Sequence, residues 1–102
     1  MSRARALARQ ADGKIVLGGD TRIDTSPTST RAWVLRYNAG GTLDTTFGAK
    51  GEAYTKDGLH TEGYDVVIQP DGKILLGGSI FHGLSSLTQP EDWDIMITRF
   101  HP

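Results

Sequence analysis

The sequence contains no cysteine, which excludes disulfide bonds and thiolate metal sites. It has no excess of either charge, since 11 basic and 12 acidic residues give a net charge of −1. Nucleic-acid binding requires a clustered basic surface, so we expect no nucleic-acid partner. No apolar run approaches the roughly 20 residues of a membrane span, and the first residues lack the apolar stretch of a secretory signal. We therefore expect no membrane insertion and no signal peptide in this chain, and the compartment stays open.

What the sequence does contain is an internal repeat. Residues 6–19 read ALARQADGKIVLGG and residues 65–78 read DVVIQPDGKILLGG, at an offset of 71 − 12 = 59. A second pair, AWVLRYN at 32–38 and IMITRFH at 95–101, matches at an offset of 99 − 36 = 63. Loops tolerate insertions, so the four extra residues belong between the two matched stretches. We predict a first repeat over residues 1–57 and a second, truncated repeat over 58–102.

Each repeat has the pattern of β-structure. An Asp-Gly pair between two apolar runs predicts a hairpin turn, which occurs once per repeat in Asp12-Gly13-Lys14 and Asp71-Gly72-Lys73. The runs KIVLGG and KILLGG are continuously apolar, as in a strand covered on both faces. Their paired glycines end the strand or admit another backbone closely. AWVLRYN and GEAYT (51–55) are predicted as the third and fourth strands, and 56–63 as a loop between repeats.

Four strands in about 60 residues is the size of a β-propeller blade. We predict an all-β chain of about two four-stranded antiparallel blades, the second lacking its last strand. Known propellers use about four to eight blades, and a blade cannot bury both apolar faces alone. The predicted partners are therefore further copies of the chain in a head-to-tail homo-oligomer, or the missing blades of a longer chain.

The repeat resembles the delta-60 repeat, a bacterial β-propeller family. RYNAGGTLDTTFGAKGEAYT follows its pattern through Arg36, Tyr37, Asn38, Leu43, Asp44, Phe47, Gly48 and Gly51, and QPDGKILLGG follows it from Gln69 to Gly78. Ala11 and Gly40 depart from the usual Pro and Asp. By similarity to NHL-type blades, ALARQ is expected innermost and GEAYT outermost. The resemblance implies a bacterial secreted or cell-surface protein with no assigned catalytic activity and no active-site residues to transfer. We also expect no cofactor.

Functional residues are sparse in this sequence. Turn chemistry accounts for the Asp-Gly-Lys motifs, and Arg36, Tyr37, Phe47 and Gly48 belong to the structural repeat motif. An acidic group around Trp93 lacks the regular spacing of a calcium loop, and no histidine spacing suits zinc. We select four weak candidates for ligand or partner binding: Trp93, Asp92, Asp94 and His82. Leu43 and Phe47 are expected to turn inward and anchor their loop.

Three functions remain open at this point. The leading hypothesis is a non-enzymatic binding or structural module that uses the variable loops at 20–31 and 79–93. The alternative is a propeller enzyme resembling lactonases or lyases, with a metal at the channel mouth held by some of Asp24, His60, His82, Glu91 and Asp92. A third possibility is that the isolated piece has no function of its own.

Overall fold

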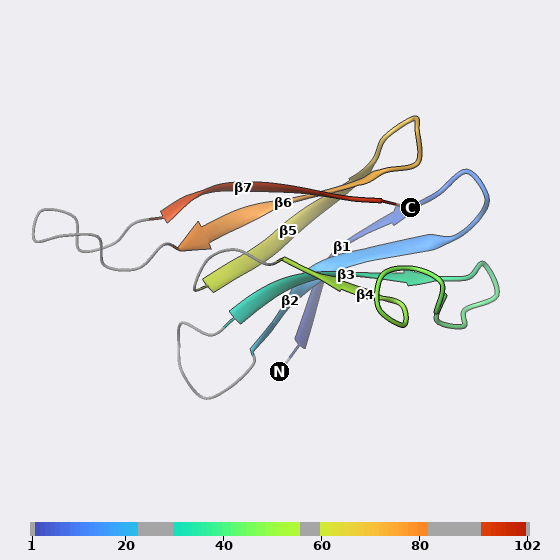
Figure 1. Cartoon of the computed structure of the whole chain (residues 1–102), viewed down its shortest axis with the longest axis horizontal. Coiled ribbons are helices and arrows are strands. Elements are labelled where there is room, and N and C mark those ends of the chain that lie inside the picture. Colours follow the sequence, from blue (N-terminus) through green and yellow to red (C-terminus); the bar gives the residue numbers. More distant parts are fainter. Residues whose placement is uncertain (1, 23–29, 56–59, 82–92, 102) are drawn as a thin grey trace, which may run out of the picture.

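The computed structural model describes residues 2–22, 30–55, 60–81 and 93–101. These residues form seven strands and no helix (Figure 1). The first repeat contains β1 (Ser2–Arg9), β2 (Ile15–Arg22), β3 (Thr30–Tyr37) and β4 (Glu52–Tyr54). The second contains β5 (His60–Ile68), β6 (Ile74–Phe81) and β7 (Trp93–Phe100). The all-β prediction is confirmed.

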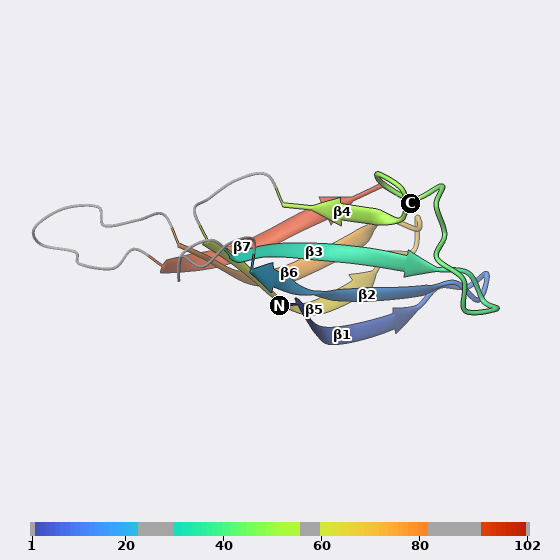
Figure 2. The same ribbon diagram turned by 90° about the horizontal axis from the view of Figure 1, so that it is seen from below.

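The strands form two antiparallel sheets in simple chain order. The first sheet has the order β1-β2-β3-β4 and the second has the order β5-β6-β7. Figure 2 shows that both sheets run in the same direction, from β1 and β5 at one side to β4 and β7 at the other. This is the arrangement of two neighbouring propeller blades, with the predicted inner strands side by side.

A three-residue hairpin turn joins the first two strands of each sheet. Gly13 N–H donates to Gln10 C=O at 2.9 Å, Gln10 N–H donates to Lys14 C=O at 2.8 Å, and Gly13 has a φ of 90°. Gln69, Gly72 and Lys73 repeat the same bonds, with Gly72 at a φ of 87°. A positive φ is easy only for glycine, which explains why both turns carry Asp-Gly.

The paired glycines allow close backbone approach and do not end their strands, since β2 continues to Arg22 and β6 to Phe81. A β-carbon on Gly19 would lie 1.9 Å from Arg3 C=O, and one on Gly78 would lie 1.8 Å from Glu62 C=O. Both glycines face a β-bulge, in β1 between Ala4 and Ala6 and in β5 between Gly63 and Asp65. Because glycine has no side chain, these positions leave room for the backbone of the inner strand at its bulge.

The apolar core lies between the two sheets. The first sheet supplies Val16, Ala32, Val34 and Phe47, and the second supplies Val66, Ile74, Leu76 and Met96. β5 packs across β1, β2 and β3. A polar contact crosses this core: Thr61 Oγ1 of β5 accepts the Ala32 N–H at 2.8 Å and lies 2.8 Å from Thr55 Oγ1. The buried hydroxyl is thus satisfied by the opposite sheet.

Three expectations were wrong in detail. Residues 56–63 do not form a continuous loop, because β5 begins at His60 and its first four residues pair with β6. Phe47 does turn inward and is buried, whereas Leu43 remains 37% exposed. The predicted variable segments 20–31 and 79–93 are also shorter than expected, because β2 and β6 extend into their starts and β3 and β7 into their ends.

The adjacent glycines of β6 provide a matched stability test. A β-carbon on Gly78 meets Glu62 C=O, while one on Gly77 meets nothing within 4 Å. We expect Gly78→Ala to destabilise the fold by about 3 kcal/mol, the upper range for overpacking. Gly77→Ala should be neutral or stabilise by up to about 1 kcal/mol, because glycine weakens a strand interior. Urea unfolding monitored by circular dichroism measures both; equal midpoints for the two variants would contradict the close approach.

Candidate functional site

Asp44, in the segment between β3 and β4, is a buried carboxylate with hydrogen-bond donors at both of its oxygens. Its Oδ2 accepts hydrogen bonds from Lys14 Nζ at 2.7 Å and Arg36 Nε at 2.9 Å. Its Oδ1 accepts from Thr46 N–H at 3.1 Å and Thr46 Oγ1 at 2.6 Å. The bond from Lys14, followed by those from Thr46, holds the pKa of Asp44 well below its usual range, against the opposing effect of burial. Asp44 is therefore a fixed anion.

The same cluster holds an aromatic ring. The Arg36 guanidinium lies over the Phe47 ring, with Cζ 4.8 Å from the centroid, and both side chains are buried. Such a cation–π contact gains strength when the cation is desolvated. Lys14, Arg36, Asp44 and Phe47 together hold the segment between β3 and β4 against the sheet. Both cations of the cluster bond the one carboxylate, and the cluster's role is structural.

The two Asp-Gly-Lys turns use their aspartates in the same way. Lys14 N–H donates to Asp12 Oδ1, and Lys73 N–H donates to Asp71 Oδ1, each at 3.0 Å. The bond from the Lys73 backbone is one of the effects that lower the pKa of Asp71. The lysine side chains differ, because Lys14 reaches Asp44 whereas Lys73 Nζ lies 3.7 Å from the exposed Asp71.

A second polar cluster lies on the inner strands β1 and β5. His60 Nε2 lies 2.7 Å from Glu62 Oε2, and Tyr64 OH donates to Glu62 Oε1. Burial of Glu62 disfavours its charge, but the bonds from Tyr64 and His60 together lower its pKa. The bond to Glu62 raises the pKa of Tyr64, whose ring lies 4.6 Å from Arg5 Cζ. Arg5 and Arg3 pair with the buried Asp20, each at 3.1 Å.

This inner cluster was not predicted from the sequence. His60 was expected in a loop, but it is a buried residue of β5, and Glu62 follows two positions later on the same strand. The spacing of His60 and Glu62 could have indicated this cluster, because residues two apart share one face of a strand. A carboxylate paired with an imidazole is a general-base arrangement, yet here the acceptor oxygens are already engaged within the cluster.

Of the weak binding candidates, the structure describes the side chain of one. Asp94 is exposed on β7, with its Oδ1 accepting the Ile95 N–H at 2.8 Å. His82 and Asp92 lie outside the described residues, as does the side chain of Trp93. Asp24 and Glu91 of the enzyme alternative also lie outside them.

Among the described residues, no three His, Cys, Asp or Glu side chains gather as a metal site, and no helix there is long and apolar enough to span a membrane.

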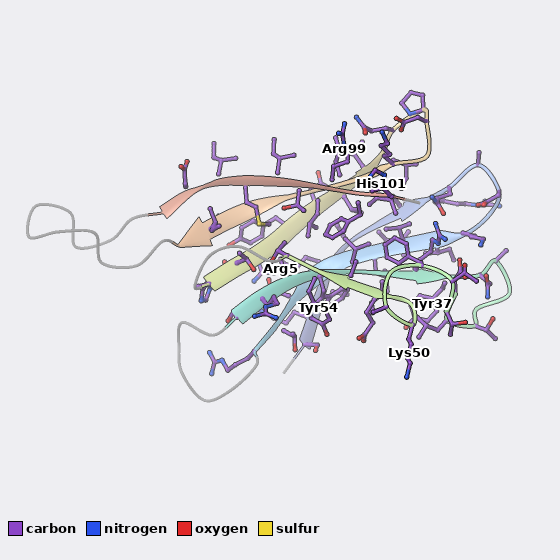
Figure 3. The ribbon with its side chains drawn as sticks, in the orientation of Figure 1. Arg5, Tyr37, Lys50, Tyr54, Arg99 and His101 are labelled. Carbon is purple, nitrogen blue, oxygen red and sulfur yellow. The ribbon has the colours of Figure 1, made fainter. Side chains whose placement is uncertain are left out.

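The second sheet has a large uncovered apolar surface on the side away from the first sheet. We call it the open face; it consists of Val67, Leu75, Ile95, Ile97 and Arg99. Ile95 is 81% exposed and Ile97 is 71% exposed, although both belong to a central part of β7. Monomeric proteins rarely leave contiguous apolar surface in water, so such a surface indicates an interaction site. Figure 3 shows Arg99 pointing away from the first sheet.

A groove of about 600 Å³ lies beside this face, between β4 and β7. Tyr54 and Thr55 form one wall, and Asp94 to Phe100 of β7 with the following His101 form the other. β7 pairs only with β6 among the described strands, so its outer edge borders the groove. The face and the groove together are the strongest candidate for an interaction site in the described part of the chain.

Comparison with known proteins identifies a family for this architecture. Residues 10–47 and 69–87, more than half of the chain, match the family described as domain of unknown function (DUF5122) beta-propeller. The two matched stretches contain both Asp-Gly-Lys turns and the Asp44 and Phe47 segment. No curated protein and no solved structure matches the chain.

The acid sensitivity of the fold tests the Asp44 cluster. A carboxylate with a depressed pKa contributes stability that is present above its ordinary value of 3.8 and is lost as the pH falls toward the lowered value. We expect the wild-type chain to lose stability between about pH 5 and pH 2. Asp44→Asn should be less stable at pH 7 and show a shallower acid slope, with Asp71 and Glu62 supplying the remainder.

Urea midpoints at pH 7, 5, 4 and 3 give this slope for each variant. Asp94→Asn is the matched control, since it removes an exposed carboxylate from β7. An unchanged slope in Asp44→Asn would show that the cluster does not control the acid response.

Proposed function

Because this chain belongs to the DUF5122 β-propeller family, we propose that it is a non-enzymatic repeat module that supplies blades to a propeller ring and acts as a binding scaffold. Its blades join head to tail through their flat apolar faces. The uncovered face of the second sheet carries this proposal, because it corresponds position by position to a face of the first sheet that is covered.

The covered face of the first sheet consists of Ala8, Val16, Ala32, Val34 and Arg36. At the two repeat offsets these positions become the open face: Val67, Leu75, Ile95, Ile97 and Arg99. Ala32 and Val34 are fully buried against the second sheet, whereas Ile95 and Ile97 are largely exposed. The chain thus repeats an interface surface without covering its second copy.

The opposite side of the first sheet is the matching half of the contact. We call it the leading face; it consists of Leu7, Leu17, Leu35 and Tyr37. Leu7 and Leu17 correspond to Val66 and Leu76 of the second sheet, which are buried against the first. Leu7 itself is 65% exposed. The leading face of one copy therefore has the chemistry to cover the open face of another.

Such a contact is heterologous, because two different surfaces meet. Heterologous contacts close into a ring when the rotation per subunit divides a full turn, and otherwise grow as fibres. Two, three or four copies supply the blades of a four-, six- or eight-bladed ring, within the size range of propellers. Blades from the rest of a longer chain would use the same two faces.

We further propose that the repeat is of the delta-60 type. Arg36, Asp44 and Phe47 belong to its pattern, and in this chain they form one buried cluster. Partner binding is assigned to the segments at 20–31 and 79–93, where the two repeats differ most in length and sequence. Trp93, Asp92 and His82 lie in the second of these.

A pair of charge substitutions tests head-to-tail assembly. Leu7→Asp places a charge on the leading face and Ile95→Asp places one on the open face. We expect the wild-type chain to elute as a ring of defined mass and each variant alone as a monomer. Mixed one to one, the two variants should form a heterodimer and nothing larger, because only one intact pair of faces remains. Light scattering after size exclusion measures the masses.

Ala39→Asp, at an exposed turn position, is the control and should keep the wild-type mass. A wild-type monomer, or mixed variants that stay monomeric, would contradict assembly of this chain through these faces.

A further inference from the structure

We propose that the outer edge of β7, with Lys73 and Arg99 beside it, is a binding site for a peptide segment of the form Asp-x-x-Phe followed by a short strand. The ligand is defined by chemistry: one carboxylate, one aromatic ring three residues later, and a backbone able to pair with a strand edge. The proposal concerns a contact within one blade and does not depend on ring assembly.

The first sheet shows how such a segment binds. β4 pairs with the outer edge of β3 through Val34↔Ala53 and its two neighbouring residue pairs. Ahead of β4, Asp44 is held by Lys14 and Arg36, and Phe47 lies under the Arg36 guanidinium. One segment therefore supplies a strand, a buried carboxylate and a buried ring to β3.

The second sheet repeats the groups that receive these three elements. Lys73 and Arg99 correspond to Lys14 and Arg36 at the repeat offsets. Among the described residues, no buried carboxylate pairs with either cation, and Lys73 lies 3.7 Å from Asp71, whose side chain is 55% exposed. Arg99 is exposed, and Figure 3 shows it and His101 near the end of β7. Two cations are therefore placed to receive one carboxylate.

The surface around these cations also has the required shape. Leu75 and Ile97 stand where the first sheet has Val16 and Val34, which share the buried core cluster with Phe47. The groove of about 600 Å³ runs along β7 from Asp94 to His101, and Tyr54 and Thr55 close its far side. A strand that paired with β7 would lie in this groove, beside β4, as β-strand addition requires.

The charge of the site decides between possible occupants. An apolar blade face alone would cover Ile95 and Ile97 but would bring no anion to Arg99, and Lys73 would keep only the exposed Asp71 at 3.7 Å. A carboxylate near the start of the bound segment can bond both cations, as Asp44 bonds their counterparts. The Asp-x-x-Phe segment satisfies the backbone edge, the apolar surface and the cations at once.

A labelled peptide with the sequence of residues 40–55, GGTLDTTFGAKGEAYT, tests this site on the full chain. We expect saturable binding at one peptide per chain, measured by fluorescence anisotropy. Replacing the aspartate of the peptide by asparagine, or its phenylalanine by alanine, should each weaken binding about tenfold or more, the range for lost charged hydrogen bonds and buried rings. These peptide variants leave the fold of the chain untouched. No binding, or equal binding by all three peptides, would overturn the proposal.

Variants of the chain locate the site. Arg99→Ala should weaken binding of the wild-type peptide about tenfold or more, because the lost cation is the counterpart of Arg36. Arg9→Ala removes an exposed arginine of β1 and should not change it. A peptide that merely exchanged with the chain's own segment on β3 would be insensitive to Arg99→Ala, and this result would also overturn the proposal.

The Leu7→Asp chain separates this site from ring assembly, since its substitution lies on the other sheet. It should bind the peptide as tightly as the wild-type chain. Peptide binding by a wild-type chain that stays monomeric would support the edge site and refute the ring. Assembly without peptide binding would support the ring and refute the edge site.

Discussion

A sheet that is apolar on both faces must be covered twice, and two such sheets packed together cover only one face of each. This constraint governs the whole structure. The contact between the first and second sheets buries Val16, Val34, Leu76 and Met96, and it leaves Leu7 exposed at one end of the pair and Ile97 at the other. Burial is worth about 25 cal/mol for each Å² of apolar surface, so both exposed faces favour association.

The repeat explains why the exposed faces match each other. Tandem copies place the same residue types at the same register, so the face that one copy buries is the face that the next copy presents. Ala32 and Ile95 illustrate this, since they occupy equivalent positions and only Ala32 is covered by a neighbouring sheet. Stability in such an arrangement is shared between neighbours, as in other repeat proteins.

Within the first blade, a different interaction holds the outer strand, β4, against the sheet. β4 is only three residues long and pairs with one edge of β3. The Asp44 carboxylate and the Phe47 ring hold the connecting segment against the sheet, because leaving either buried group without its partner would be costly. The second sheet carries the corresponding lysine and arginine beside β7. The outer edge of β7 therefore corresponds to the edge of β3 that β4 covers in the first sheet.

The strands, the two hairpin turns and the relation between the repeats could be predicted from the sequence, because they depend on local chemistry. Asp-Gly specifies a turn through backbone conformation alone, and a continuous apolar run specifies a strand covered on both sides. Phe47 was correctly expected to be buried. The start of β5 was missed because HTEG is polar and contains glycine, and its pairing with β6 depends on residues nearly 20 positions away.

The candidate site could be predicted less well from the sequence. The motif residues Lys14, Arg36 and Asp44 were visible as a pattern, but the sequence by itself determined only that Lys14 and Arg36 recur, as Lys73 and Arg99. The tertiary structure decided that they meet, that His60 and Glu62 share a cluster with Tyr64, and that Ile95 and Ile97 remain uncovered. The physical reason is distance: turn and strand propensities act over a few residues, whereas ion pairing, burial and exposure depend on which segments the folded chain brings within contact.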